Sequence, residues 1–397
     1  MALLRVCVLV YLCLYLCLHL SASERSSKDR ELTEASLLAK FLGIRFQDNI
    51  STKSFSEIFS KIYKKSAFPC PVLPPSATTP TSVHRLRPSD IKVIAALGDS
   101  LTAGRGAQGG LPGLLVDYRG LSWSIGGDGD YSHIATLPNI LRQYNNKLYG
   151  YSEGVASFKS RLNMAKTGAM SDEILEQAQN LVQRLKDDKH VDIANDWKLI
   201  TIFIGANDLC DWCIDEDKFS AVNYRRNLEE TLDYLFANVP RAFVNLVEIL
   251  DLEFINILDT TPICKFVHKL VCDCASNPKT PEDRDKLIKL REGYQAVTRQ
   301  LVSSGRYDSS DNFTVVLQPF YENTTIPLKK TGKPDFSYFG SDCFHFSKKS
   351  HVASAEALWN NMIEPVGSKQ TSWTPGEVIK CPTEASPYLY TAKNSQK

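Results

Sequence analysis

The sequence lacks an excess of charge of either sign. Its 397 residues include 46 lysines and arginines against 45 aspartates and glutamates, which leaves a formal net charge of +1. Nucleic-acid binding draws its affinity from clustered lysine and arginine, and no basic block here is longer than a couple of residues. The sequence therefore predicts no nucleic-acid partner and no electrostatic membrane anchor.

Long apolar runs are missing after the first 20 residues. Val6–Leu20 is an almost unbroken apolar run, but at about 15 residues it is shorter than the roughly 20 that a bilayer span needs. It follows Arg5 and precedes Ser21-Ala22-Ser23, which is the pattern of a cleaved secretory signal rather than of an uncleaved anchor. We interpret residues 1–23 as a signal peptide. Because the C-terminal residues 391–397 are polar, we expect a secreted, extracellular protein without an anchor of its own.

Cysteine, by contrast, is plentiful, with eleven in the chain. Three lie in the signal, and an even set of eight in a secreted protein indicates disulfides. Their connectivity is left open: a local Cys210–Cys213 pair and a Cys70–Cys381 bridge across the domain ends are both candidates. A zinc site on Cys210 and Cys213 with Cys272 or Cys274 is a weaker alternative, because the second cysteine pair has the wrong spacing. The same secreted context makes N-glycosylation expected at three sequons, which begin at Asn49, Asn312 and Asn323.

The order of apolar and amphipathic stretches predicts a main domain over residues 90–365. It is preceded by an extension with a Pro/Ser/Thr-rich connector, residues 24–89, and followed by a C-terminal extension, residues 366–397. Within the main domain, short apolar runs alternate with amphipathic stretches, which is typical of a parallel sheet covered by helices. The expected strands are 93–97, 199–204, 242–249 and 313–317, with a weaker strand ending near Leu162. The expected helices are 172–186, 222–236, 283–302 and 347–362.

Four short blocks carry the chemistry. The first, Gly98-Asp99-Ser100-Leu101, follows the first expected strand, where the loops of a parallel sheet hold the functional residues. Taken alone it favours a serine that caps a helix in a glycine turn. The other blocks reverse that interpretation; they are Asn163 to Ala169, Gly205-Ala206-Asn207-Asp208 and Ser341-Asp342-Cys343-Phe344-His345.

In this order, the four blocks resemble the GDSL lipase/esterase family, also called SGNH hydrolases, over about residues 90–362. The resemblance implies a flavodoxin-like three-layer α/β/α fold with a central parallel sheet. It also implies Ser100 as nucleophile, His345 as general base and Asp342 as the carboxylate that orients the imidazole. The Ser100 and Gly168 backbone N–H groups and the Asn207 amide would form the oxyanion hole. No metal and no cofactor are implied.

Several residues of the chain have more than one interpretation. His351 is the nearest other histidine, and we place it on the surface of the last expected helix. Asp208 is expected to satisfy turn backbone groups, which leaves Asn207 for the oxyanion. Trp123, in a glycine-rich loop, either shapes an acyl pocket or belongs to a packed surface loop. Residues 243–257 form either a lipid-facing element or a strand with its turn.

Within the family, the blocks are similar to the phospholipase B type found in animals, as are Ser122 to Gly127 and Trp373 to Glu377. That likeness implies hydrolysis of acyl esters of phospholipids and lysophospholipids, with retinyl esters and glycerides as further substrates and with transient membrane-surface contact. Members of that type carry several tandem copies and a membrane anchor, whereas one copy is visible here, so a soluble secreted enzyme is expected. The alternatives are a carbohydrate or small-ester esterase of the same family and a catalytically silent lipid-binding protein. The oligomeric state is left open.

Overall fold

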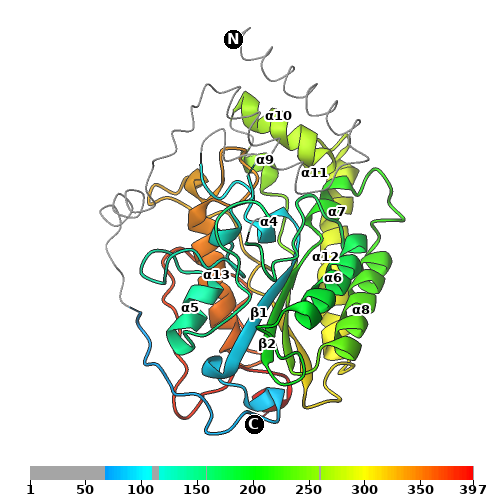
Figure 1. Ribbon diagram of the computed structural model, residues 1–397. Coiled ribbons are helices and arrows are strands. Elements are labelled where there is room, and N and C mark those ends of the chain that lie inside the picture. The colour runs from blue at the N-terminus through cyan, green and yellow to red at the C-terminus, as the bar shows by residue number, and fades with distance from the viewer. Residues whose placement is uncertain (1–67, 110–115, 158, 259–260, 397) are drawn as a thin grey trace, which may run out of the picture. The chain divides into compact units, whose positions relative to one another are not determined.

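The computed structural model describes residues 68–109, 116–157, 159–258 and 261–396. Residues 65–397 form one compact unit, built around a four-stranded parallel sheet of order β1-β2-β3-β4 (Figure 1). The expected signal peptide, the start of the N-terminal extension and Asn49 lie outside the described residues. The strands are β1 Ile91–Gly98, β2 Trp197–Phe203, β3 Ala242–Val247 and β4 Phe313–Gln318.

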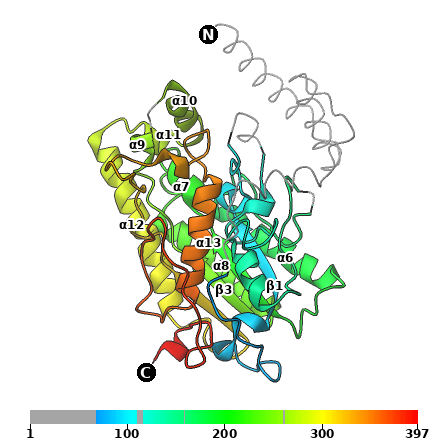
Figure 2. The ribbon, with the colours of Figure 1, turned by 90° about the vertical axis from the view of Figure 1, so that its left-hand side faces the viewer.

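Burial on both faces explains why the strand sequences do not alternate. Every residue of β2 and β3 is buried, and β1 exposes only Lys92, as expected for a parallel sheet covered by helices on both sides. Helices α6, α8 and α12 cover one face, and α5 and α13 cover the other (Figures 1 and 2). The predicted three-layer α/β/α architecture is confirmed.

The four predicted helices all form, with ends that shift by a few residues. They are α6 Ile174–Asp187, α8 Ala221–Asn238, α12 Pro281–Ser303 and α13 Lys348–Met362. Ser347 caps α13 by accepting a hydrogen bond from the Lys349 N–H. The other helices are α4 Ser100–Ala103, α5 Leu137–Tyr144, α7 Ala206–Asp211, α9 Ile255–Leu258, α10 Pro262–Val271 and α11 Asp273–Ser276, with 3₁₀ turns at Val83–Arg85, Pro88–Asp90, Arg119–Leu121, Ser171–Glu173, Phe336–Tyr338 and Lys393–Ser395.

The prediction of a weak strand ending near Leu162 is wrong, although the segment lies where such a strand would pair with β1. Two isolated parallel bridges, at Tyr149 and Asn163, join it to the outer edge of β1. Between them Gly150 and Arg161 adopt positive φ, which interrupts a regular ladder. The chain thus passes to one side of β1 and then returns to the other side as β2. The carboxyl ends of β1 and β2 therefore flank a topological switch point, the usual ligand crevice of such sheets.

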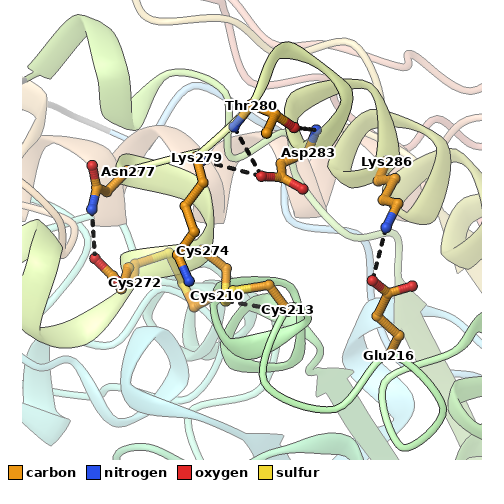
Figure 3. The surroundings of a disulfide bond; sticks show 11 residues. Cys210, Cys213, Glu216, Cys272, Cys274, Asn277, Lys279, Thr280, Asp283 and Lys286 are labelled. Carbon is orange, nitrogen blue, oxygen red and sulfur yellow. Dashed lines mark hydrogen bonds and ion pairs between the residues drawn. A yellow bond between two sulfur atoms is a disulfide. The ribbon is translucent and has the colours of Figure 1, made fainter.

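Four disulfides within the described part of the chain link segments that are distant in sequence. The Cys70–Cys381 bridge expected from sequence is present, and it joins the connector to the C-terminal extension. The local Cys210–Cys213 pair is wrong: Cys210 bonds to Cys272 and Cys213 to Cys274, which ties α7 to α11 (Figure 3). The same bonds occupy the thiols that the zinc alternative needs. The remaining bridge is Cys264–Cys343.

Two aromatic predictions are corrected by burial. Trp123, which the sequence assigned either to an acyl pocket or to a packed surface loop, has no exposed surface and packs edge-on against Phe203. His351, expected on a helix surface, is also fully buried, and its Nδ1 accepts the Trp123 N–H at 3.3 Å. Helix α13 is covered on its outer side as well, because the C-terminal extension packs along it; for example, Trp359 Nε1 donates to the Lys380 carbonyl at 2.8 Å.

Burial of His351 predicts a pH-dependent stability. Burial, with a smaller contribution from the nearby His345, lowers the pKa of His351 from 6.5 to about 3. Between these values the unfolded chain binds the proton and the folded chain does not, so the free energy of unfolding falls as the pH drops. The slope for this group is about 1.4 kcal/mol per pH unit. Urea unfolding between pH 7 and pH 4 should show a shallower pH dependence for His351→Gln, which keeps an acceptor for Trp123. An unchanged slope would contradict this role.

No helix within the described ranges is long and apolar enough to span a bilayer.

Candidate active site

Ser100 lies at the first turn after β1. The strand ends at Gly98, whose Cβ position would fall 2.5 Å from the Phe203 carbonyl oxygen and from Thr102 Oγ1, so no larger residue fits. Asp99 caps the short helix α4 by accepting the Leu101 N–H at 2.9 Å. Ser100 is thereby held at a helix start, where backbone N–H groups have no partner within the helix.

The loop before α13 brings His345 and Asp342, the predicted base and its carboxylate, to Ser100. His345 Nε2 lies 2.9 Å from Ser100 Oγ, and His345 Nδ1 lies 2.6 Å from Asp342 Oδ2. The other carboxylate oxygen, Asp342 Oδ1, accepts the Phe344 and His345 N–H groups at 3.1 and 3.0 Å. A hydroxyl, an imidazole and a buried carboxylate are therefore linked in one chain of hydrogen bonds.

The buried carboxylates of the site differ in their tendency to ionise. Burial alone would raise the pKa of Asp342, but the hydrogen bond and charge of His345 and two backbone N–H groups hold it below its ordinary value. Burial instead raises the pKa of Asp99 to about 7 and that of Asp208 to about 6. Asp342 is thus the carboxylate that stays ionised beside the imidazole.

The two other predicted oxyanion residues lie on loops that are bonded to the serine turn and to each other. Gly168 has φ +80° in a turn closed by the Ala169 N–H and the Lys166 carbonyl. The Lys166 N–H in turn donates to the Gly98 carbonyl at 3.1 Å. Asn207, at the start of α7, donates through Nδ2 to the Ala169 carbonyl at 2.8 Å. One amide hydrogen of Asn207 is thereby fixed, which sets the direction of the other.

Two contacts that were not predicted from the sequence hold these loops in place. Gln177 of α6 accepts the Gly98 N–H at 2.8 Å and donates to the Gly98 carbonyl at 2.9 Å. Asp208 accepts the Ser171 N–H and hydroxyl, so it satisfies backbone as expected, but across the fold rather than within its own turn. The sequence signal that could have revealed Gln177 is a polar residue at an inward-facing position of an amphipathic helix.

Helices α9, α10 and α11 are attached to the site through their disulfides. Cys264 of α10 bonds to Cys343, which stands between Asp342 and His345. His268, also on α10, is 2.8 Å from the Cys343 carbonyl oxygen through Nε2. The pair of disulfides at α11 joins this subdomain to Cys210 of α7, three residues after Asn207, and to Cys213 just beyond α7 (Figure 3). Both the histidine loop and the asparagine loop are therefore braced by the α9–α11 subdomain.

Burial bears on two further expectations. Residues 243–257 do not form a lipid-facing element as a whole, because β3 and the turn through Leu252 are largely buried, and only Asn256 and Ile257 at the end are exposed. Asn312 and Asn323 of the described sequons are both exposed. Within the described ranges, no cluster of three or more His, Cys, Asp or Glu side chains could hold a metal ion.

Comparison with known proteins places this arrangement in a family. Residues 94–358 match the GDSL-like Lipase/Acylhydrolase family. The chain is 46% identical over 341 residues to the human "Phospholipase B1, membrane-associated" and 45% identical over 343 residues to the mouse protein of that name. Each alignment covers 83% of this chain and 23% of the relative, so the chain spans about a quarter of the length of these relatives.

Solved structures are more distant. A lipase from a goat rumen metagenome is 19% identical, with a TM-score of 0.37 and coverage of 67% of this chain and 95% of the other. Phospholipase A1 from Streptomyces albidoflavus is 14% identical, with a TM-score of 0.29 and coverage of 67% and 97%. The match over residues 94–358 and the high identity to the phospholipase B1 proteins lead to one conclusion: this chain belongs to the GDSL-like lipase/acylhydrolase family.

Proposed function

We propose that the chain is a serine esterase that hydrolyses acyl esters of phospholipids and lysophospholipids. The observation that carries the proposal is the His345 imidazole, which lies within hydrogen-bond distance of both the Ser100 hydroxyl and the Asp342 carboxylate. This is the arrangement that converts a weakly nucleophilic serine into a reactive one.

In the acylation step, His345 Nε2 takes the Ser100 proton while Oγ bonds to the ester carbonyl carbon. The tetrahedral intermediate then collapses, the bond to the alcohol oxygen breaks, and His345 gives its proton to that oxygen. In deacylation, His345 takes a proton from water as the water oxygen bonds to the acyl carbon. The bond between that carbon and Ser100 Oγ then breaks, the fatty acid leaves, and His345 returns the proton to Oγ. Asp342 keeps the proton of His345 on Nδ1, so that Nε2 faces the serine as a base.

The carbonyl oxygen becomes negatively charged in both steps, and the Ser100 N–H, the Gly168 N–H and the Asn207 amide are the donors proposed to stabilise it. Asn207→Ala should lower kcat by about a hundred- to a thousand-fold with little change in KM, because the bond is made to the transition state. Asn223→Ala is the matched control, since its amide donates to the surface carbonyl of Asp217. Equal kcat values for the two variants would remove Asn207 from the oxyanion site.

The proposed substrate class draws support from the relatives, whose printed name is phospholipase B1. The experiment compares turnover of long-chain phosphatidylcholine, lysophosphatidylcholine and an acetyl ester by the purified, disulfide-bonded protein. We expect the two phospholipids to have the higher kcat/KM. A preference for the acetyl ester would instead favour the small-ester esterase alternative.

Secretion is part of the proposal. It is supported by the apolar N-terminal run, by four disulfides and by two exposed sequon asparagines. Expression of the full chain in animal cells should release a protein that begins near Glu24 and loses mass when its N-glycans are removed at Asn312 and Asn323.

A further inference from the structure

The apolar side of α10 faces away from the protein. Ile263, Phe266 and Leu270 follow the spacing of one helix face, and Phe266 is 53% exposed and Leu270 63%. The opposite face, with Cys264 and His268, is buried. Helix α10 is therefore attached to the rest of the protein through the face that carries Cys264 and His268. Its other face presents a row of large apolar side chains to the outside.

This apolar row continues onto neighbouring segments and toward the site. Ile257 of α9 is 53% exposed. Ile263 lines a cavity of about 230 Å³ together with Phe336 and Phe339. Gly340, Ser341 and Cys343, which belong to the loop that carries Asp342 and His345, line the same cavity. Helix α10 also lies above the carboxyl ends of the strands, on the same side as α4 (Figure 1). We call Ile257, Ile263, Phe266 and Leu270 the α9–α10 face.

The charged side chains on helices α9 and α10 are lysines. Lys265 and Lys269 are exposed beside Phe266 and Leu270, and the helices α9 and α10 contain no acidic residue. The carboxylate of Glu253, before α9, is held in an ion pair with Arg284 at 2.9 Å, and Asp273 follows α10 at the start of α11. Apolar side chains interleaved with lysines on one helix face suit an interface of acyl chains and anionic headgroups.

We propose that the α9–α10 face is the surface by which this protein docks on anionic phospholipid bilayers. Phe266 and Leu270 insert among the acyl chains, and Lys265 and Lys269 contact the headgroups. The Cys264–Cys343 disulfide fixes this face relative to the histidine loop, so docking places the site at the lipid surface. The purpose of this docking rests on the proposed function, but binding to the bilayer itself requires no catalysis.

The test measures binding to phosphatidylcholine vesicles with and without phosphatidylserine, in a Ser100→Ala background that leaves the lipid intact. Phe266→Gln combined with Leu270→Gln should weaken binding by about tenfold or more, because two large apolar side chains no longer leave water. Lys265→Gln combined with Lys269→Gln should remove the gain from phosphatidylserine. The matched control is Val72→Gln with Val378→Gln, two exposed valines on the terminal segments that the Cys70–Cys381 disulfide joins.

Equal vesicle binding by the α9–α10 and control variants would overturn the proposal, as would no gain from phosphatidylserine in the Ser100→Ala protein. With Ser100 restored, Phe266→Gln/Leu270→Gln should keep turnover of a soluble short-chain ester within about twofold of the unmodified protein and lose activity on vesicles. An equal loss on both substrates would also overturn it. If the Ser100→Ala protein still hydrolysed lipid, the proposed function would fail while the docking result stood on its own.

Discussion

Ser100→Ala is expected to lower ester turnover by about a million-fold, the scale of loss when the nucleophile of a serine hydrolase is removed. The reason is geometric: the alanine has no oxygen at the position 2.9 Å from His345 Nε2, so no acyl-enzyme forms. Turnover of a soluble ester and of phosphatidylcholine should fall together.

Ser89→Ala is the matched control for this substitution. Ser89 is also a buried serine, at the opposite end of β1, and its hydroxyl donates to the Leu73 carbonyl at 2.6 Å. It should keep full turnover with some loss of stability. Wild-type turnover by folded Ser100→Ala protein would exclude Ser100 as the nucleophile.

Asp342→Asn is expected to lower kcat by about ten-thousand-fold while the protein stays folded. Oδ1 of Asp342 accepts two backbone N–H groups, so the single oxygen of asparagine is held there. The amide NH₂ then faces His345 Nδ1, which must accept rather than donate. The His345 proton moves to Nε2, and the imidazole can no longer take the proton of Ser100.

The control for charge loss on the same loop is Asp335→Asn. Asp335 pairs with Lys349 at 2.8 Å, so its replacement removes a surface ion pair of small energetic value and should leave kcat nearly unchanged. If Asp342→Asn lost no more activity than Asp335→Asn, the imidazole would not depend on Asp342 for its orientation.

The sheet and the site blocks could be predicted because their signals are local. Each strand is an apolar run that is buried on both faces, and each block follows a strand or precedes a helix. The parallel topology then brings Ser100 and Asn207 to one edge. The prediction that Asp342, His345 and Ser100 lie together agrees with the hydrogen-bond distances, whereas their catalytic roles remain a prediction.

The missed features depend on what covers an element from far away in the chain. His351 was expected on a helix surface, because helix periodicity cannot show that the Trp123 loop packs against that side of α13. The Cys210–Cys272 and Cys213–Cys274 bonds required knowing that α11 lies against α7. The outward apolar face of α10 was hidden for the same reason, since an amphipathic helix does not show which of its faces is buried.

Active-site labelling shows whether Ser100 is the serine that His345 activates. The folded, disulfide-bonded protein is treated with a fluorophosphonate, which reacts with activated serines, and the adduct is located by peptide mass spectrometry. We expect a single adduct on Ser100 that is lost in His345→Ala and kept in the Asn223→Ala control. An adduct on any other residue, or no adduct on protein that hydrolyses esters, would contradict it.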